Sequence, residues 1–272
     1  MNAFRTHFAI EFRMGLRNRN ALLMTYLFPL AFYLLVSGLM SRLNPYFKDS
    51  IIPAIVSFAV LSGIVLGLPS PLITYRENGV FRSYKVNGVP AASILLIPVI
   101  SSLLHTVIVA FIIALTAGPL FHAPLPTNWL GFVGYLLLLA AALSGIALLI
   151  GVVAANTRVS ILVTQLIYLP SILLGGVMVP SSVLTGAFRR IGLLMPTSYA
   201  VSFYNGIARP VTPLVPALPA AIILLAGTAV SFLLALLLFS WDRQNAGRKA
   251  NPALAILAMV PYVVGAVIFG GG

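Results

Sequence analysis

Long apolar runs separated by short polar segments form the dominant pattern of this 272-residue chain. Six of the runs cover residues 21–40, 51–73, 91–120, 129–155, 160–179 and 214–240. An α-helix rises 1.5 Å per residue, so about 20 apolar residues match the ~30 Å hydrocarbon core of a bilayer. The pattern therefore predicts an all-α polytopic membrane protein with six transmembrane helices.

A seventh apolar run covers residues 253–269 and has Pro261 in its middle. It is short for a membrane crossing, so it has two interpretations: a seventh transmembrane helix, or a surface or re-entrant segment. We treat residues 1–240 as one transmembrane domain and residues 241–272 as a C-terminal extension that contains this run.

Residues 1–20 are polar and basic, and Phe4, Phe8 and Phe12 recur at every fourth position. This spacing places the three aromatic rings on one helical face, which predicts a helix lying on the membrane surface. A solvated leader is the alternative. A cleavable signal peptide is not expected, because the next apolar run is longer than the 7–15 residues of a signal sequence and no cleavage site follows it.

The composition excludes several kinds of chemistry. Hydrophobic residues make up 60% of the chain and charged residues 7%, and the mean hydropathy is +1.07. The four acids, Glu11, Asp49, Glu77 and Asp242, all lie outside the predicted helix centres. An ion-coupled secondary transporter and a lipid-modifying membrane enzyme are thus disfavoured, because both need acids or histidines grouped in or beside the membrane. The chain contains no cysteine.

The net charge of +12 comes from basic residues at the ends of the apolar runs. They indicate topology signals and contacts with anionic membrane lipids, and no nucleic-acid partner is expected. With a cytoplasmic N-terminus, eleven of the sixteen basic residues lie on the inner side and five on the outer side. The positive-inside rule therefore predicts a cytoplasmic N-terminus.

The polar segment 74–90 contains Gly79, Gly88 and Pro90, which bracket about eight residues and predict a two-turn helix. We expect Phe81 and Tyr84 to project from it, as suits docking into a partner's groove. An ordinary basic loop is the alternative. The candidate docking residues are Tyr75, Arg76, Glu77, Gly79, Phe81, Arg82, Tyr84 and Lys85.

Residues 175–210 are too apolar for a water-exposed loop, and Pro196 interrupts a partial helical stripe within them. The pattern predicts short helices that re-enter the outer leaflet; a surface helix without a transport role is the alternative. The candidate transport-path and outer-gate residues are Tyr168, Gly175, Gly176, Met178, Pro180, Pro196 and Tyr199.

His105 lies inside the third apolar run beside Ser101 and Ser102. It has two interpretations, a pathway-lining residue or a partner in an inter-helix hydrogen bond, of which the second is favoured. No metal site is predicted, because His7, His105 and His122 are scattered and no acid accompanies them.

Two of these segments resemble one known family. The sequence RENGVFRSYKVNGVP resembles the coupling-helix loop of type-2 ATP-binding-cassette (ABC) exporter permeases, although this family often has Gly-Thr-Leu where this chain has Gly79-Val80-Phe81. The sequence GGVMVPSSVLTGAFRRIGLLMPTSYAV resembles the exit of the family's fifth helix, and the basic N-terminus its elbow helix. The resemblance covers about residues 1–240, and the family usually ends after the sixth helix.

The resemblance implies a multi-pass permease of a prokaryotic plasma or inner membrane. It implies pairing with a second copy or a related permease chain, and export driven by an ABC ATPase subunit. The absence of acids from the predicted helix centres favours a hydrophobic or amphipathic cargo, such as a drug, lipid or glycan. A non-transporting membrane partner with the same fold is an alternative that the sequence leaves open.

The chain itself is not expected to be an enzyme or to bind a cofactor. A P-loop requires Gly-Lys-Ser/Thr, but Lys48, Lys85 and Lys249 each follow a residue other than glycine. We therefore expect ATP and Mg²⁺ on a separate ATPase subunit.

Overall fold

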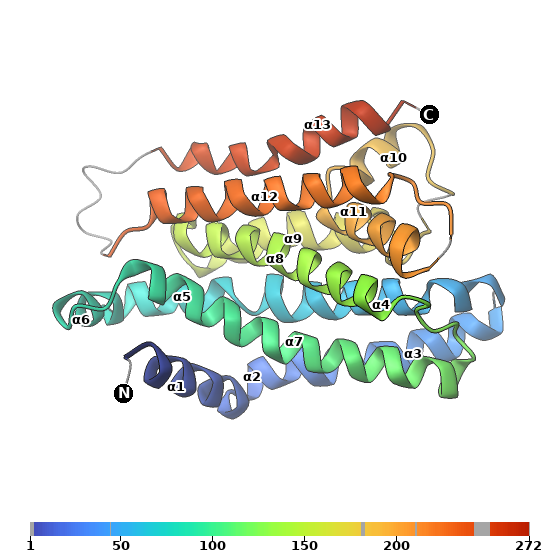
Figure 1. The fold of residues 1–272 in the computed structure, drawn as a ribbon. Helices are drawn as coiled ribbons and strands as arrows, with labels where there is room; N and C mark the ends of the chain where they lie inside the picture. Colours follow the sequence, from blue (N-terminus) through green and yellow to red (C-terminus); the bar gives the residue numbers. More distant parts are fainter. Residues whose placement is uncertain (1–2, 44, 181–182, 210, 242–250, 272) are drawn as a thin grey trace.

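The computed structural model describes residues 3–43, 45–180, 183–209, 211–241 and 251–271, without the side chains of residues 3–7, 20–21 and 45–46. The described residues fold into helices and connecting loops, and the long helices lie side by side as one bundle (Figure 1). The short helix α6 (Val80–Val86) lies at one end of the bundle and α10 (Gly186–Gly192) at the other. We call these the α6 end and the α10 end.

Seven helices in the described part of the chain are long and apolar enough to cross a membrane, which confirms the predicted all-α polytopic fold. Two are composite. The first joins the π-helical segment η1 (Leu23–Leu27) to α3 (Phe28–Leu43), and the second spans Phe47–Glu77. The next four are α7 (Ala91–Phe121), α8 (Trp129–Val153), α9 (Thr157–Leu174) and α12 (Ala217–Leu238).

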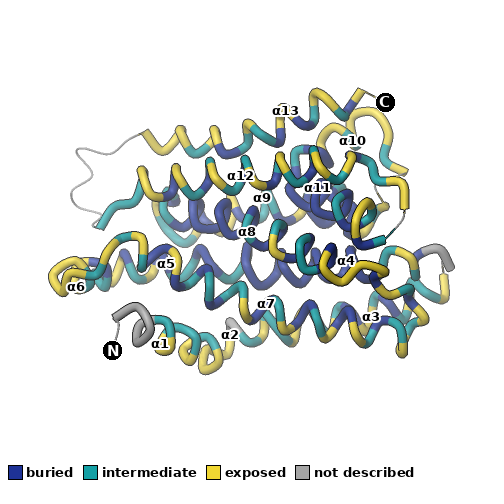
Figure 2. Tube along the Cα trace, viewed as in Figure 1, coloured by how far each residue is buried: buried dark blue, intermediate teal, exposed yellow. Residues whose placement is uncertain are grey.

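The second composite helix lies at the centre of the bundle (Figure 2). It contains α4 (Ile51–Val60), the π-helical segment η3 (Leu61–Leu66) and α5 (Pro69–Glu77), and 89% of its most apolar window is buried, against 17% for the first helix. Every residue of α4 is buried, as expected for a helix that is hydrophobic on all sides. The Tyr135 hydroxyl fastens α8 to α4, because it donates to the Pro53 carbonyl oxygen and lies 2.8 Å from the Ser57 hydroxyl.

The seventh apolar run forms a helix beside α12, made of the 3₁₀ segment η7 (Pro252–Met259) and α13 (Val260–Phe269). The structure therefore favours a membrane-length helix over a surface segment. Pro261 is tolerated because it lies in the first turn of α13, where no helical hydrogen bond needs its missing N–H. Gly227 of α12 and Gly265 of α13 allow the seventh helix to pack closely against its neighbours. A Cβ on Gly227 would overlap the Tyr262 hydroxyl, and a Cβ on Gly265 would overlap the Tyr199 hydroxyl.

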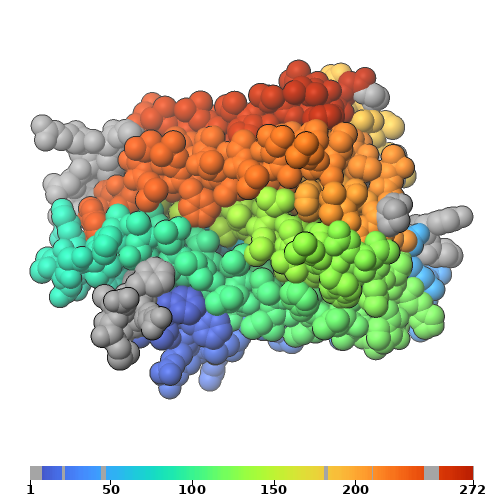
Figure 3. Space-filling model, viewed as in Figure 1, coloured from blue at the N-terminus to red at the C-terminus, as the bar shows by residue number. Residues whose placement is uncertain are grey.

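The N-terminal helix α1 (Ala3–Arg17) lies outside the bundle against α7, at the α6 end (Figure 3). The Phe12 ring stacks on His105 with 4.3 Å between the ring centroids, and the Tyr26 hydroxyl lies 2.7 Å from His105 Nδ1. His105 thus makes the inter-helix hydrogen bond favoured from the sequence. The side chain of Phe4, the first residue of the predicted stripe, lies outside the described residues.

If all seven of these helices cross the membrane, α1 and the end of α13 lie on opposite faces of it. The chain contains no cysteine, so single cysteines can be labelled with an impermeant thiol reagent on intact cells. We expect Thr185→Cys and Gly271→Cys, at the α10 end, to react, and Arg82→Cys and Arg158→Cys to react only after lysis; all four positions are exposed. Labelling of Gly271→Cys only after lysis would show that the seventh helix does not cross.

Candidate functional site

The polar segment after the second membrane helix forms the predicted short helix. α6 begins after Gly79, which has φ of +72°, and is followed by Gly88, which has φ of +71°. Both values lie in the left-handed region that glycine adopts without a steric penalty. The two glycines therefore permit the sharp turns that place α6 at the end of the bundle.

Phe81 does not project from α6, so that part of the prediction is wrong. Its side chain is 3% exposed, and its ring lies 5.5 Å from the Phe239 ring and 6.5 Å from the Tyr75 ring, centroid to centroid. Tyr84 is half-buried against the same core. The buried side chains of α6 attach this helix to the ends of α5 and α12.

Arg76 is likewise buried instead of presented to a partner. Its guanidinium donates from Nη1 to the Val152 carbonyl oxygen at 2.7 Å and from Nη2 to the Ala154 carbonyl oxygen. These carbonyls lie at the C-terminal end of α8, where no further turn of helix supplies N–H donors and the helix dipole favours a cation. Arg76 therefore ties α5 to α8.

The remaining candidates define the surface of this end. Glu77, Arg82 and Lys85 are exposed, and Val86 is exposed to 88%. We call Glu77, Arg82, Lys85 and Val86 the docking surface. Sequence reasoning missed Val86; an apolar residue between Lys85 and Asn87 in a polar segment was the available signal.

At the α10 end, residues 186–208 form the short helices predicted from their apolar stripe: α10, α11 (Pro196–Phe203) and the π-helical segment η5 (Tyr204–Ala208). The structure buries Tyr168, Gly175, Gly176, Pro196 and Tyr199, whereas Met178 and Pro180 are exposed. Gly175 allows α9 to meet α11, because a Cβ there would overlap Thr197.

Two tyrosines proposed for the transport path belong to the core of the single chain. The Tyr199 hydroxyl donates to the Tyr262 backbone oxygen at 3.3 Å, and the Tyr168 hydroxyl lies 3.4 Å from the Ser62 hydroxyl. Tyr199 is fully buried, so it does not line an open path within one chain. Its place against the seventh helix could not be foreseen, because that helix lies far along the sequence.

Arginines also fasten the α10 end. Arg189 and Arg190 donate to the carbonyl oxygens of Phe269 and Gly270, at 3.2 and 3.3 Å, and so cap the C-terminal end of α13. Arg209 pairs with Asp49, with 2.9 Å between Nη2 and Oδ1. Arg209 also donates to the Asp49 backbone carbonyl oxygen. In a regular helix this oxygen would accept from the backbone N–H of residue 53, but Pro53 has no N–H.

One polar side chain that sequence reasoning missed lies on α9. Gln165 is half-exposed among the outward-facing Ile161, Leu162 and Leu169, and within the described structure its amide has no hydrogen-bond partner. An amide facing hydrocarbon is unfavourable, so glutamine in a membrane helix usually faces another helix or a polar path. Gln165 is therefore a polar group on an otherwise apolar, outward-facing side of α9.

Seven membrane-length helices, with two short helices folded against one end, define a polytopic helical membrane protein. A family model described as ABC-2 type transporter matches residues 2–208, and the chain belongs to this family. It is thus a transmembrane permease component of an ABC transporter and not itself a catalytic subunit. No curated protein and no solved structure matches the chain.

The Arg76 contacts yield a stability prediction. Arg76→Ala leaves the Val152 and Ala154 carbonyls without their donor, at about 1–3 kcal/mol for each unsatisfied group. We expect a clearly lower unfolding temperature of the purified protein in detergent. The matched control Arg158→Ala removes an exposed arginine and should change stability by no more than about 0.5 kcal/mol. Equal unfolding temperatures for the two variants would contradict the structural role of Arg76.

Proposed function

We propose that the chain is the permease subunit of an ATP-driven exporter that moves a hydrophobic or amphipathic substrate, such as a drug, lipid or glycan, out of the cytoplasm. A separate ABC ATPase subunit hydrolyses ATP and docks on α6. Membership of the ABC-2 type transporter family supports this assignment, and the sequence lacks a P-loop of its own. The docking surface is on the cytoplasmic side in this proposal, as the positive-inside rule predicts.

The observation that carries the proposal is the attachment of α6 to the bundle. Phe81 packs on Phe239, just after the end of α12, and Arg76 holds the end of α8. Packed interiors transmit displacement because they have little free volume. A displacement of α6 by a docked ATPase would therefore move α8 and α12 together, which couples ATP hydrolysis to the helices that lead to the α10 end.

The transport path lies, in this proposal, between two permease chains and not within one. Tyr168 and Tyr199 fill the interior of the single chain, whereas α9 presents Gln165 on an outward face. Pairing two chains through this face would remove the amide from lipid and would place the exposed Met178 near the shared axis. The short helices α10 and α11 would then close the path on the outer side.

The positions of the acids that the structure describes argue against an ion-coupled carrier. Asp49 and Glu77 are exposed at the two ends of the second membrane helix, and Glu11 lies on α1 outside the bundle. A proton- or sodium-coupled carrier needs an acid within the membrane to bind the ion. A non-transporting partner protein with the same fold would bind the ATPase without supporting substrate movement, so a transport assay separates the two functions.

The docking surface yields a mutational prediction. Val86→Asp, and Arg82→Glu combined with Lys85→Glu, should weaken co-purification with the cognate ATPase more than tenfold, because a lost docking anchor costs about 2 kcal/mol. ATP hydrolysis stimulated by the permease should fall together with this association. Arg42→Glu reverses a charge that is also exposed, at the other end of the bundle, and should change neither the association nor the ATP hydrolysis. Full association of both docking variants would refute the assignment of this surface.

The pairing proposal can be tested by cross-linking in membranes. Gln165→Cys and Leu169→Cys, on the outward face of α9, should form disulfide-linked dimers on mild oxidation. Leu225→Cys on α12 is the control, because Leu225 is as exposed as Leu169 and should face lipid. Cross-linking of Leu225→Cys with none at Gln165 or Leu169 would place the interface elsewhere.

A further inference from the structure

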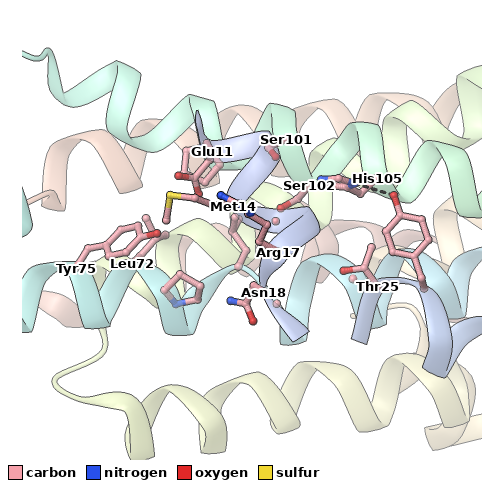
Figure 4. A pocket seen from close by; sticks show the side chains of 17 residues that line it. Glu11, Met14, Arg17, Asn18, Thr25, Leu72, Tyr75, Ser101, Ser102 and His105 are labelled. Atoms are coloured by element: carbon pink, nitrogen blue, oxygen red, sulfur yellow. Dashed lines mark hydrogen bonds between the residues drawn. The ribbon is translucent and has the colours of Figure 1, made fainter. Parts of the chain in front are cut away.

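A cleft of about 340 Å³ lies between α1, the second membrane helix and α7, towards the α6 end (Figure 4). Its lining is mainly apolar and includes Met14, Pro71 and Leu72. Polar side chains reach it from several elements: Glu11 and Arg17 from α1, Asn18 from the residue after α1, Thr25 and Tyr26 from η1, Tyr75 from α5, and Ser101, Ser102 and His105 from α7. An apolar cleft of this volume with a few convergent polar groups is typical of a small-molecule site.

One wall of the cleft is closely packed. His105 is 6% exposed, stacks on Phe12 and lies within hydrogen-bonding distance of Tyr26, so it joins α1 and the first membrane helix to α7. Gly15 lies against the His105 ring, and a Cβ there would lie 3.0 Å from Nε2. These contacts hold α1 in place beside the opening, so the cleft is a built feature of the bundle.

Glu11 supplies a negative charge that its surroundings do not neutralise. Its carboxyl is half-buried, and burial raises its pKa above the ordinary value. Burial and, second, the charge of Glu11 raise the pKa of the Tyr84 hydroxyl. Among the described side chains, none forms an ion pair with Glu11. A carboxylate loses favourable hydration when it is buried, and a bound cation would compensate for that loss.

Arg17 gives the cleft a positive charge as well. It is exposed and lines the same cleft as Glu11 (Figure 4). One carboxylate and one guanidinium together complement a zwitterion with an ammonium and a phosphate. The hydroxyl oxygens of Ser101, Ser102 and Tyr75 can accept hydrogen bonds from a primary ammonium. A quaternary ammonium has no N–H and would leave these acceptors unused.

We propose that this cleft binds a phosphoethanolamine group, with the ammonium on Glu11 and the phosphate on Arg17. The group can come from an ethanolamine phospholipid or from soluble phosphoethanolamine. The lipid is within reach, because α1 exposes Ile10, Met14 and Leu16 as a surface-lying membrane helix does. None of the residues that line the cleft belongs to the docking surface or to α9.

Native mass spectrometry of the purified permease tests the proposal without the ATPase or transport. The detergent-solubilised protein is titrated with phosphatidylethanolamine, phosphatidylcholine or phosphatidylglycerol of identical acyl chains. We expect about tenfold tighter binding of the ethanolamine lipid than of the choline lipid, equivalent to about 1.4 kcal/mol. Glu11→Gln should abolish this preference, and the matched control Glu77→Gln, also a single lost carboxylate, should retain it.

A second variant, Ser102→Phe, fills the cleft without changing charge and should abolish the preference as well. An unchanged unfolding temperature identifies folded variants. Equal affinity of the wild type for the ethanolamine and choline lipids would overturn the proposal, as would a preference that persists in both Glu11→Gln and Ser102→Phe.

Competition with soluble O-phosphoethanolamine identifies the source of the ligand. If the soluble compound displaces the lipid from the wild type but not from Glu11→Gln, the site is supported and the headgroup alone is a sufficient ligand. Absence of displacement, with the lipid preference intact, supports the site with the membrane lipid as its ligand.

Discussion

Carbonyl groups at helix ends need hydrogen-bond donors, and near a bilayer water supplies them poorly. Arginine side chains meet this need at both ends of the bundle. Arg76 serves the end of α8, Arg189 and Arg190 serve the end of α13, and Arg209 serves a carbonyl that Pro53 leaves unsatisfied. Each contact joins segments far apart in the chain, so the same hydrogen bonds that complete the helix ends also fix how the helices are arranged.

This use of charge explains why the bundle needs so few acids. The guanidinium groups are balanced by backbone dipoles, and Arg209 with Asp49 is the ion pair found among the described residues. A buried carboxylate partner would itself have to be desolvated, at a cost that often exceeds the attraction. The basic residues at the helix ends therefore have two roles: several hold the bundle together while the whole set biases its orientation.

The sequence was sufficient for features that depend on neighbouring residues. Length and apolarity located the membrane helices, Gly79 and Gly88 bracketed α6, and the apolar stripe before Pro196 indicated the short helices of the α10 end. It was insufficient for the direction of single side chains. Phe81 turns inward because Phe239 lies beside it, and Tyr199 is buried because the seventh helix covers it. Tertiary packing decides which side chains become neighbours, and the pattern of polar and apolar residues along the sequence does not reveal it.

Seven crossings, the number that the membrane-length helices of the described residues would give, would restrict how this permease can be joined to other domains. α1 and the docking surface lie at one end of the bundle, and α13 finishes at the other, where Arg190 holds Gly270. Anything linked covalently beyond residue 271 would emerge on the face opposite α6. An ATPase domain fused there could not reach the docking surface, and a second permease half fused there would begin on the wrong side of the membrane. In the proposed assembly, an ATPase joined covalently to this chain would therefore have to be attached at the N-terminal end, on the same side as α6.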